Sequence, residues 1–295
     1  MIARSSLGEC ISSWLYEGRH ILIGLESYFD GSYTGKSWRE GDYISLAGQA
    51  AEDDIWREFD PRWNEILGGE GRRPKTPYIH MREATKGLGP FSWRHGWNLK
   101  KVEALVIALL QYLQTQDKKR FHQFACSIDL KAYRKLIGEG FTIPDPVDLC
   151  NGYCSESVLV WFLTSYPGII SAAHYFFDVN EPFETPFKET WKKEKQCNLG
   201  DLSARSTYWQ LIKTVTTAEM RDKPALQAAD LLAWASNRVL TAPDGAFAKY
   251  LEQIMKQIIP SFWVVFDEKR LRLELSQSEP CWRATRVSDK RRGRS

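Results

Sequence analysis

The chain alternates between two periodicities of apolar residues. Short runs rich in β-branched and aromatic residues predict strands, and apolar residues spaced three and four positions apart predict helices. The predicted strands cover residues 19–30, 42–50, 121–128, 169–179, 211–217 and 262–266. The predicted helices cover residues 52–67, 98–116, 145–165, 184–195, 224–240 and 247–259. Two strands come first and the rest alternate with helices, which predicts one α/β domain with a mixed sheet.

The predicted domain spans residues 19–267, between an N-terminal arm (1–18) and a C-terminal extension (268–295). The extension ends in a basic tail, residues 286–295, which carries five Lys or Arg and one Asp. Because the net charge of the whole chain is only +3, the remainder is close to neutral. Such a tail is compatible with contact to nucleic acid, and it is also typical of a solvated chain end.

Several classes of protein are disfavoured by what the sequence lacks. It holds no apolar run approaching the roughly 18 residues of a membrane span, and its first ten residues lack the apolar core of a signal peptide. We therefore expect a cytoplasmic protein whose six cysteines are free thiols. Dinucleotide-binding, P-loop and serine-hydrolase motifs are absent from the sequence.

One carboxylate occupies an unusual position. Asp230 lies within the apolar stretch that follows Pro224, and of its helical neighbours Leu226, Gln227, Ala233 and Trp234 only Gln227 is polar. A carboxylate in that setting is costly unless it is paired or binds a metal. Asp230 is therefore either an acid bonded to an Arg or a backbone N–H, or a metal ligand.

Three predicted strands end in aspartates: Asp30, Asp129 and Asp178. Binding sites in such sheets gather outside the carboxyl ends of strands, where Asp230 and Glu83 can join them. Converging carboxylates repel one another unless a counter-charge is present, and hard divalent cations supply it. Asp30 and Gly31 also form a standard turn dipeptide, so a structural role for Asp30 stays open.

A second group lies between the first long helices. His80, Arg82 and Glu83 follow a short predicted strand at residues 77–81. This cluster combines side chains that can contact a metal or a phosphate with a carboxylate. A surface turn would explain the same run of polar residues about as well. A preceding loop at residues 72–75 adds Arg72, Arg73 and Lys75.

Three segments resemble the domain of unknown function 3800 family. Residues 226–234 (LQAADLLAW) are similar to its C-terminal signature, Leu-Gln-x-Ala-Asp followed by apolar residues. Residues 28–32 (YFDGS) resemble its Asp-Glu-Ser-Gly element, and residues 78–83 (YIHMRE) its His-containing segment. Gly31 stands where the family usually has Glu, so one possible ligand is lost.

The resemblance implies a ribonuclease H-like α/β fold: a mixed sheet flanked by helices, with helical insertions and a C-terminal extension. It implies a nuclease that uses Mg²⁺ or Mn²⁺ to hydrolyse phosphodiester bonds of DNA or RNA. Asp30 and Asp230 would hold the metal together with a third aspartate. Asp129 is the candidate for this third ligand, and Asp178 is its rival. His80 would carry a proton or orient a phosphate, and Glu83 is a further candidate.

Two other functions compete with this one. The loss at Gly31 leaves room for a catalytically inactive module of a defence or mobile-element system that binds nucleic acid or a protein. A carbohydrate-active enzyme with paired carboxylates and Trp residues ranks below both. The expected partner is nucleic acid, contacted by residues 72–75 and 286–294, with a homo-oligomer or partner protein as a further option and no membrane.

Overall fold

The computed structural model describes residues 22–276, apart from 36, 38, 70–72, 167–169, 180, 198–208 and 261. Its six strands form one mixed sheet in the order β5-β4-β1-β2-β3-β6. This confirms the predicted α/β class with a mixed sheet. The strands are β1 (Leu22–Tyr33), β2 (Tyr43–Glu52), β3 (Phe121–Asp129), β4 (Ile170–Asp178), β5 (Ile212–Ala218) and β6 (Trp263–Phe266).

Within this sheet β2 alone runs against the other strands. It pairs antiparallel with both β1 and β3, whereas β1–β4, β4–β5 and β3–β6 are parallel pairs. Five strands therefore deliver their carboxyl ends to the same edge of the sheet. The turn expected at Asp30 and Gly31 is wrong, because both residues continue β1 and pair with Ala47 and Leu46 of β2.

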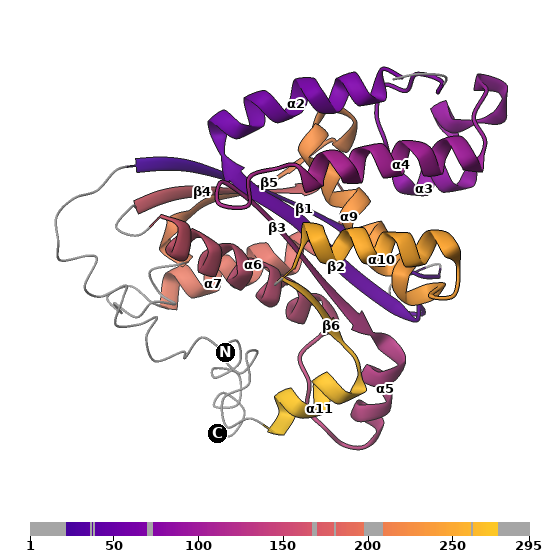
Figure 1. Cartoon of the computed structure of the whole chain (residues 1–295). Helices are drawn as coiled ribbons and strands as arrows, with labels where there is room; N and C mark the ends of the chain where they lie inside the picture. Colours follow the sequence, from indigo (N-terminus) through magenta and orange to yellow (C-terminus); the bar gives the residue numbers. More distant parts are fainter. Residues whose placement is uncertain are drawn as a thin grey trace, which may run out of the picture.

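Helices cover both faces of the sheet (Figure 1). In that view these helices lie above the sheet: α2 (Asp53–Leu67), α3 (Met81–Lys86), α4 (Leu99–Gln114), α9 (Pro224–Thr241) and α10 (Ala246–Ile258). Below it lie α6 (Pro146–Ser165) and α7 (Glu184–Cys197), with α5 (Leu130–Gly138) and α11 (Glu268–Ser276) at the lower end. Three 3-10 turns, η1 (Gly89–Phe91), η2 (Trp93–His95) and η3 (Met220–Asp222), complete the described elements. Each face of the sheet buries its own apolar core.

The helix α9 is almost wholly enclosed. Fourteen of its eighteen residues are buried, and it packs across β1 and β2 on the upper face, with α10 and α2 alongside. Its nearly all-apolar sequence explains this position, because a helix that is apolar all round is stable only inside a core. The buried Asp230 is thereby fixed on the upper face of the sheet, near the carboxyl ends of β1 and β4.

Three local expectations differ from the structure. Residues 77–80 form no strand, and a short helix, α3, begins at Met81. Residues 130–138 form α5, which the apolar pattern did not predict. Residues 268–276, assigned to a C-terminal extension, form α11, whose Leu271 is buried and which packs against α5 and β6. The arm, the basic tail and Arg72 lie outside the described residues.

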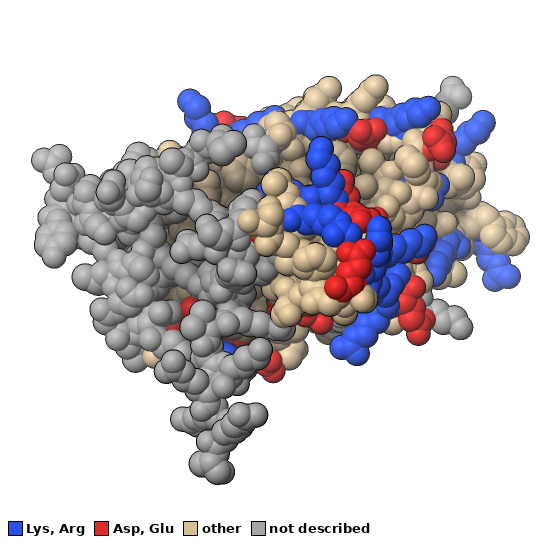
Figure 2. Space-filling view, turned by 90° about the horizontal axis from the view of Figure 1, so that it is seen from below, with Lys and Arg blue, Asp and Glu red and all other residues tan. Residues whose placement is uncertain are grey.

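The lower side of the molecule shows blue and red side chains intermingled (Figure 2). On α5 and α11 this reflects ion pairs, such as Lys135 with Glu268 at 2.8 Å and Arg272 with Glu139 at 2.6 Å. Paired exposed charges create no field of one sign. These paired charges on α5 and α11 therefore offer little attraction for a polyanion.

Two simpler expectations concern the cysteines and the membrane. The described cysteines Cys126, Cys150 and Cys154 are buried and form no disulfide, as the sequence predicted. Within the described ranges, no helix combines the length and apolar character that crossing a bilayer requires.

Candidate active site

The two polar residues of the LQAAD segment hold one stretch of backbone against α9. Gln227 and Asp230 are three positions apart, so both point to the same side of the helix. Gln227 Oε1 accepts the N–H of Ile79 at 3.1 Å, and Asp230 Oδ2 accepts the N–H of Met81 at 2.6 Å. Alternate N–H groups of an extended segment face the same way, which explains the match in spacing. The motif therefore fixes the start of α3 beside Asp230.

Asp30 and Asp178 lie side by side on neighbouring parallel strands. Phe29 of β1 pairs with Phe177 of β4, and the next residue of each strand is the aspartate. Phe29 and Phe177 pack into the lower core, so alternation directs the two aspartates to the upper face, where α9 lies. Asp178 Oδ1 accepts the N–H of Met220 at 2.9 Å. Asp30 Oδ1 accepts the N–H of Gly31 at 2.7 Å.

A fourth carboxylate, Glu181, joins this group, and the sequence pattern did not predict it as a site residue. It follows β4, and its N–H donates a hydrogen bond to the carbonyl of Asp178 at 3.3 Å. A Cβ built on Gly31 would come to 2.5 Å of Glu181 Oε2 and would overlap the Phe183 ring. The glycine therefore leaves the space that Glu181 and Phe183 fill.

Two oxygens of this group have no fixed hydrogen-bond donor. Asp30 Oδ2 and Glu181 Oε2 are buried without an N–H donor among the described residues. The two carboxyls instead hydrogen-bond to each other, which raises the pKa of Asp30 and lowers that of Glu181. Asp30 is 2% exposed and Asp230 6% exposed. Because two buried carboxylates repel each other, this contact requires a shared proton or a cation.

The pKa values of the four carboxyls are all raised. Burial is the largest cause in each case, and it raises the pKa of Glu181 to about 7 and that of Asp230 to about 8. For Asp30 the neighbouring charges of Glu181 and Asp230 raise the pKa further. For Asp178 burial outweighs the N–H of Met220, which lowers the pKa. We call Asp30, Asp178, Glu181 and Asp230 the carboxylate group.

The group has no cationic side chain of its own. No Lys or Arg is a leading influence on the pKa of any of the four within the described part of the chain. The described residues also contain no three His, Cys, Asp or Glu that already form a metal-binding arrangement. The chemistry of the donors is nevertheless that of a hard divalent cation: carboxylate oxygens, two of them without an N–H donor.

His80 and Glu83 lie at the rim of this group. Burial lowers the pKa of His80, and the charges of Glu83 and Asp178 only partly offset it. The imidazole is therefore neutral at pH 7 and can accept a proton. Burial alone would raise the pKa of Glu83, but hydrogen bonds from Tyr78 (2.7 Å) and Arg221 (3.1 Å) lower it overall. Glu83 is thus an ionised, paired side chain.

Asp129 lies apart from the other aspartates. It is the N-cap of α5, and its Oδ1 accepts the N–H groups of Lys131 at 2.9 Å and Ala132 at 3.0 Å. The registers place Ala125, not Asp129, level with Asp30 across β2. Two strand spacings and four residues separate the aspartates, roughly 16 Å along the sheet. The structure therefore brings Asp178, and not Asp129, beside Asp30.

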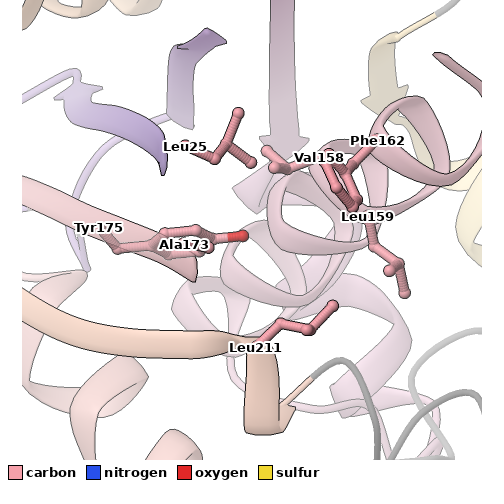
Figure 3. Close-up of a pocket in the computed structure, with 7 residues that line it drawn as sticks. All are labelled: Leu25, Val158, Leu159, Phe162, Ala173, Tyr175 and Leu211. Carbon is pink, nitrogen blue, oxygen red and sulfur yellow. The ribbon is translucent and has the colours of Figure 1, made fainter. Parts of the chain in front are cut away.

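An apolar pocket lies elsewhere (Figure 3). Side chains from β1, α6, β4 and the residue before β5 line it: Leu25, Val158, Leu159, Phe162, Ala173, Tyr175 and Leu211. Its free volume of about 10 Å³ is roughly that of one water molecule. It is a packing defect of the lower core, far too small for a substrate.

Comparison of the chain with models of protein families, with curated proteins and with solved structures finds no match. The functional interpretation therefore depends on the residues and contacts described above.

Proposed function

We propose that the chain is a divalent-metal-dependent nuclease of ribonuclease H-like architecture, related to the domain of unknown function 3800 family. The observation that carries this proposal is the carboxylate group. Three separate segments of the chain contribute buried carboxyls with raised pKa values to one edge of the sheet, with no cation among their main influences. A buried cluster of like charges that lacks a counter-charge favours binding of a cation.

The strand order supports the architecture. The strands run in the order β3-β2-β1-β4-β5 with β2 antiparallel to the rest, and β6 extends the sheet at the β3 edge. This is a mixed sheet flanked by helices, as the resemblance implies. Asp30 and Asp178 come from two neighbouring strands of this sheet, and Asp230 comes from the helix packed over them.

Asp30, Asp178, Glu181 and Asp230 would hold Mg²⁺ or Mn²⁺. When bound, the cation supplies a Lewis acid for the phosphoryl oxygens and lowers the pKa of the attacking water. Loading requires the four carboxyls to ionise and draw together, since no three of the described ligands are already placed for one ion. The N–H of Met81 keeps one oxygen of Asp230 in place while this occurs.

The remaining groups handle the proton and the substrate. Neutral His80 accepts the proton that the attacking water loses as the phosphorus–oxygen bond to the leaving group breaks. Arg221, whose side chain is largely exposed while it pairs with Glu83, faces a phosphate outside the group. Because the carboxyls must be ionised, cleavage increases between pH 6 and pH 8.

The test is Mn²⁺-dependent cleavage of single-stranded DNA, duplex DNA and RNA by the full chain. Asp230→Asn keeps an acceptor for Met81 but removes the charge, and we expect it to lower cleavage about 100-fold or more. Asp129→Asn, the matched control, stays within about twofold of wild type. Equal cleavage by wild type and Asp230→Asn would remove the carboxylate group from the mechanism.

The inactive-module alternative makes a different prediction. Its supporting observation is that the described carboxyls are not already arranged around one ion. If wild type binds nucleic acid but cleaves none of the three substrates with Mn²⁺, the binding module is favoured over the nuclease.

A further inference from the structure

One large aromatic side chain stands on the surface near the carboxylate group. Trp93 is 78% exposed, whereas Phe91 and Trp97 on either side of it are buried. Trp is among the side chains that gain most from burial. Because the same short segment places two aromatic rings inside and one outside, the exposure of Trp93 needs a reason other than a lack of core space.

The backbone around Trp93 is well anchored. Residues 88–96 form η1 and η2, closed by main-chain hydrogen bonds such as His95 N–H to Ser92 O at 2.9 Å. Gly89 and Gly96 adopt positive φ values of 54° and 80°, which permits two tight reversals in a short segment. The rings of Phe91 and Trp97 pack together below, with centroids 5.0 Å apart. Trp93 is therefore presented on a supported turn.

The segment that carries Trp93 is more cationic than acidic. Residues 83–103 carry four cationic side chains, Lys86, Arg94, Lys100 and Lys101, against Glu83 and Glu103. Glu83 is itself paired with Arg221. The Arg94 guanidinium lies 5.8 Å from the centre of the Trp93 ring. An exposed aromatic ring beside cationic side chains is an arrangement that proteins use to bind single-stranded nucleic acid.

The segment is also close to the carboxylate group. It follows α3 directly, and η1 packs against α3. The first residue of α3, Met81, donates to Asp230, and a six-residue helix is only about 9 Å long. Figure 1 shows α3 beside α4 at one end of the upper layer. A strand of nucleic acid that contacts Trp93 therefore needs only a few nucleotides to reach the carboxylates.

We propose that Trp93 is a stacking platform for an unpaired base of the nucleic-acid substrate, with phosphates held by Arg94, Lys86 and Lys100. This inference rests on the proposed nuclease function and specifies a single-stranded substrate segment. A base stacks on one face of the indole, which a paired duplex base does not allow. Leu88 and Leu99 are also exposed on this surface. An anionic membrane and a second copy of the chain are therefore the competing partners for it.

The test is binding of fluorescein-labelled oligo(dT) and oligo(U) of 15 nucleotides by the full chain in EDTA, where no metal-dependent cleavage occurs. We expect Trp93→Ala to weaken binding at least fivefold and Trp93→Phe to weaken it less. Arg94→Ala should reduce the dependence of affinity on salt. Phe141→Ala is the matched control, because Phe141 is 40% exposed with the Arg272 guanidinium 5.7 Å from its ring.

Several outcomes would overturn the platform. These are equal binding by wild type and Trp93→Ala, no binding by wild type, Trp93-dependent binding to vesicles of anionic lipid, or a Trp93-dependent dimer in sedimentation. Cleavage is measured separately with Mn²⁺. Trp93-dependent binding without cleavage supports the platform and contradicts the nuclease, whereas cleavage with Trp93-independent binding does the reverse.

Discussion

The carboxyl ends of β3 and β4 both carry an aspartate after a run of apolar residues, yet the two regions differ in what surrounds the carboxyl. At β3, Asp129 receives two N–H groups from the first turn of α5. At β4, Asp178 receives N–H groups from Met220 and Val179, yet it also faces Asp30, with Glu181 nearby, and its pKa is still raised by burial. The first carboxylate completes a helix cap, and the second belongs to a group whose charges lack cationic partners among the described residues.

The difference shows how to separate structural acids from candidate ligands. An N-cap aspartate is satisfied by its own chain and stabilises the folded state. The carboxylate group does the opposite, because burial and mutual repulsion raise its pKa values. Glu274 illustrates a third solution, since it is buried but forms an ion pair with Arg270 at 2.7 Å. A buried acid is a site candidate when neither a cap nor an ion pair accounts for it.

The largest expected effect concerns pH. The pKa of Asp230 is raised to about 8 and that of Glu181 to about 7, so the metal-free folded state holds protons that the unfolded chain releases above about pH 4. The free energy of unfolding therefore decreases from pH 5 to pH 8, by up to about 1.4 kcal/mol per pH unit for each such carboxyl. Urea unfolding in EDTA measures it. Asp230→Asn should be more stable than wild type at pH 8, and a flat wild-type profile would contradict the raised pKa values.

Metal binding should reverse this loss of stability. At pH 8, Mn²⁺ at a hundredfold excess over its Kd stabilises the folded state by about 2.7 kcal/mol, a rise in Tm of roughly 5–10 °C. At pH 5 protons compete with the ion and the rise shrinks. Asp30→Asn and Glu181→Gln should abolish the rise in Tm at pH 8, while Asp129→Asn retains it. An equal rise in all four proteins would place any bound ion elsewhere.

A smaller effect is expected at Gly31. Its replacement by Ala overlaps the Phe183 ring and crowds Glu181, so we expect a loss of about 1–3 kcal/mol in the free energy of unfolding. Displacement of Glu181 should also weaken Mn²⁺ binding. Gly24→Ala is the matched control, since a Cβ there meets no atom within 4 Å. Unchanged Mn²⁺ affinity in Gly31→Ala would argue against Glu181 as a ligand.

The smallest effect concerns the cap at β3. Asp129→Ala removes the acceptor of two N–H groups at the start of α5, which costs about 1 kcal/mol. Thermal unfolding should detect a decrease in Tm of roughly 2–4 °C. Cleavage by this variant should match wild type at a temperature where both are folded. A large loss of cleavage would return Asp129 to the site.

These regions also show how far the sequence alone can lead. Apolar periodicity predicts α9 and the burial of Asp230, because burial follows from the neighbours along one helix. Choosing between Asp129 and Asp178 requires knowing which N–H groups meet each carboxyl. The stretch after Asp129 forms a helix that buries only Leu130, Ala132 and Leu136, and so short an apolar pattern does not by itself identify Asp129 as its N-cap.

Glu181 was beyond the reach of the sequence for a different reason. Its role depends on β4 lying beside β1 and on a space left by Gly31, and both are tertiary facts. The departure at Gly31 was visible and indicated a lost ligand. Only the fold shows that a carboxylate from the segment after β4 lies against Gly31.

We propose above that Asp30, Asp178, Glu181 and Asp230 form one divalent-cation site. Crystals grown with Mn²⁺ at pH 8 and measured near the manganese absorption edge would locate any bound ion. We expect an anomalous peak within coordination distance of Asp30 and Asp230 that is absent from crystals of Asp230→Asn. A peak only at other residues, or none at saturating Mn²⁺, would contradict it.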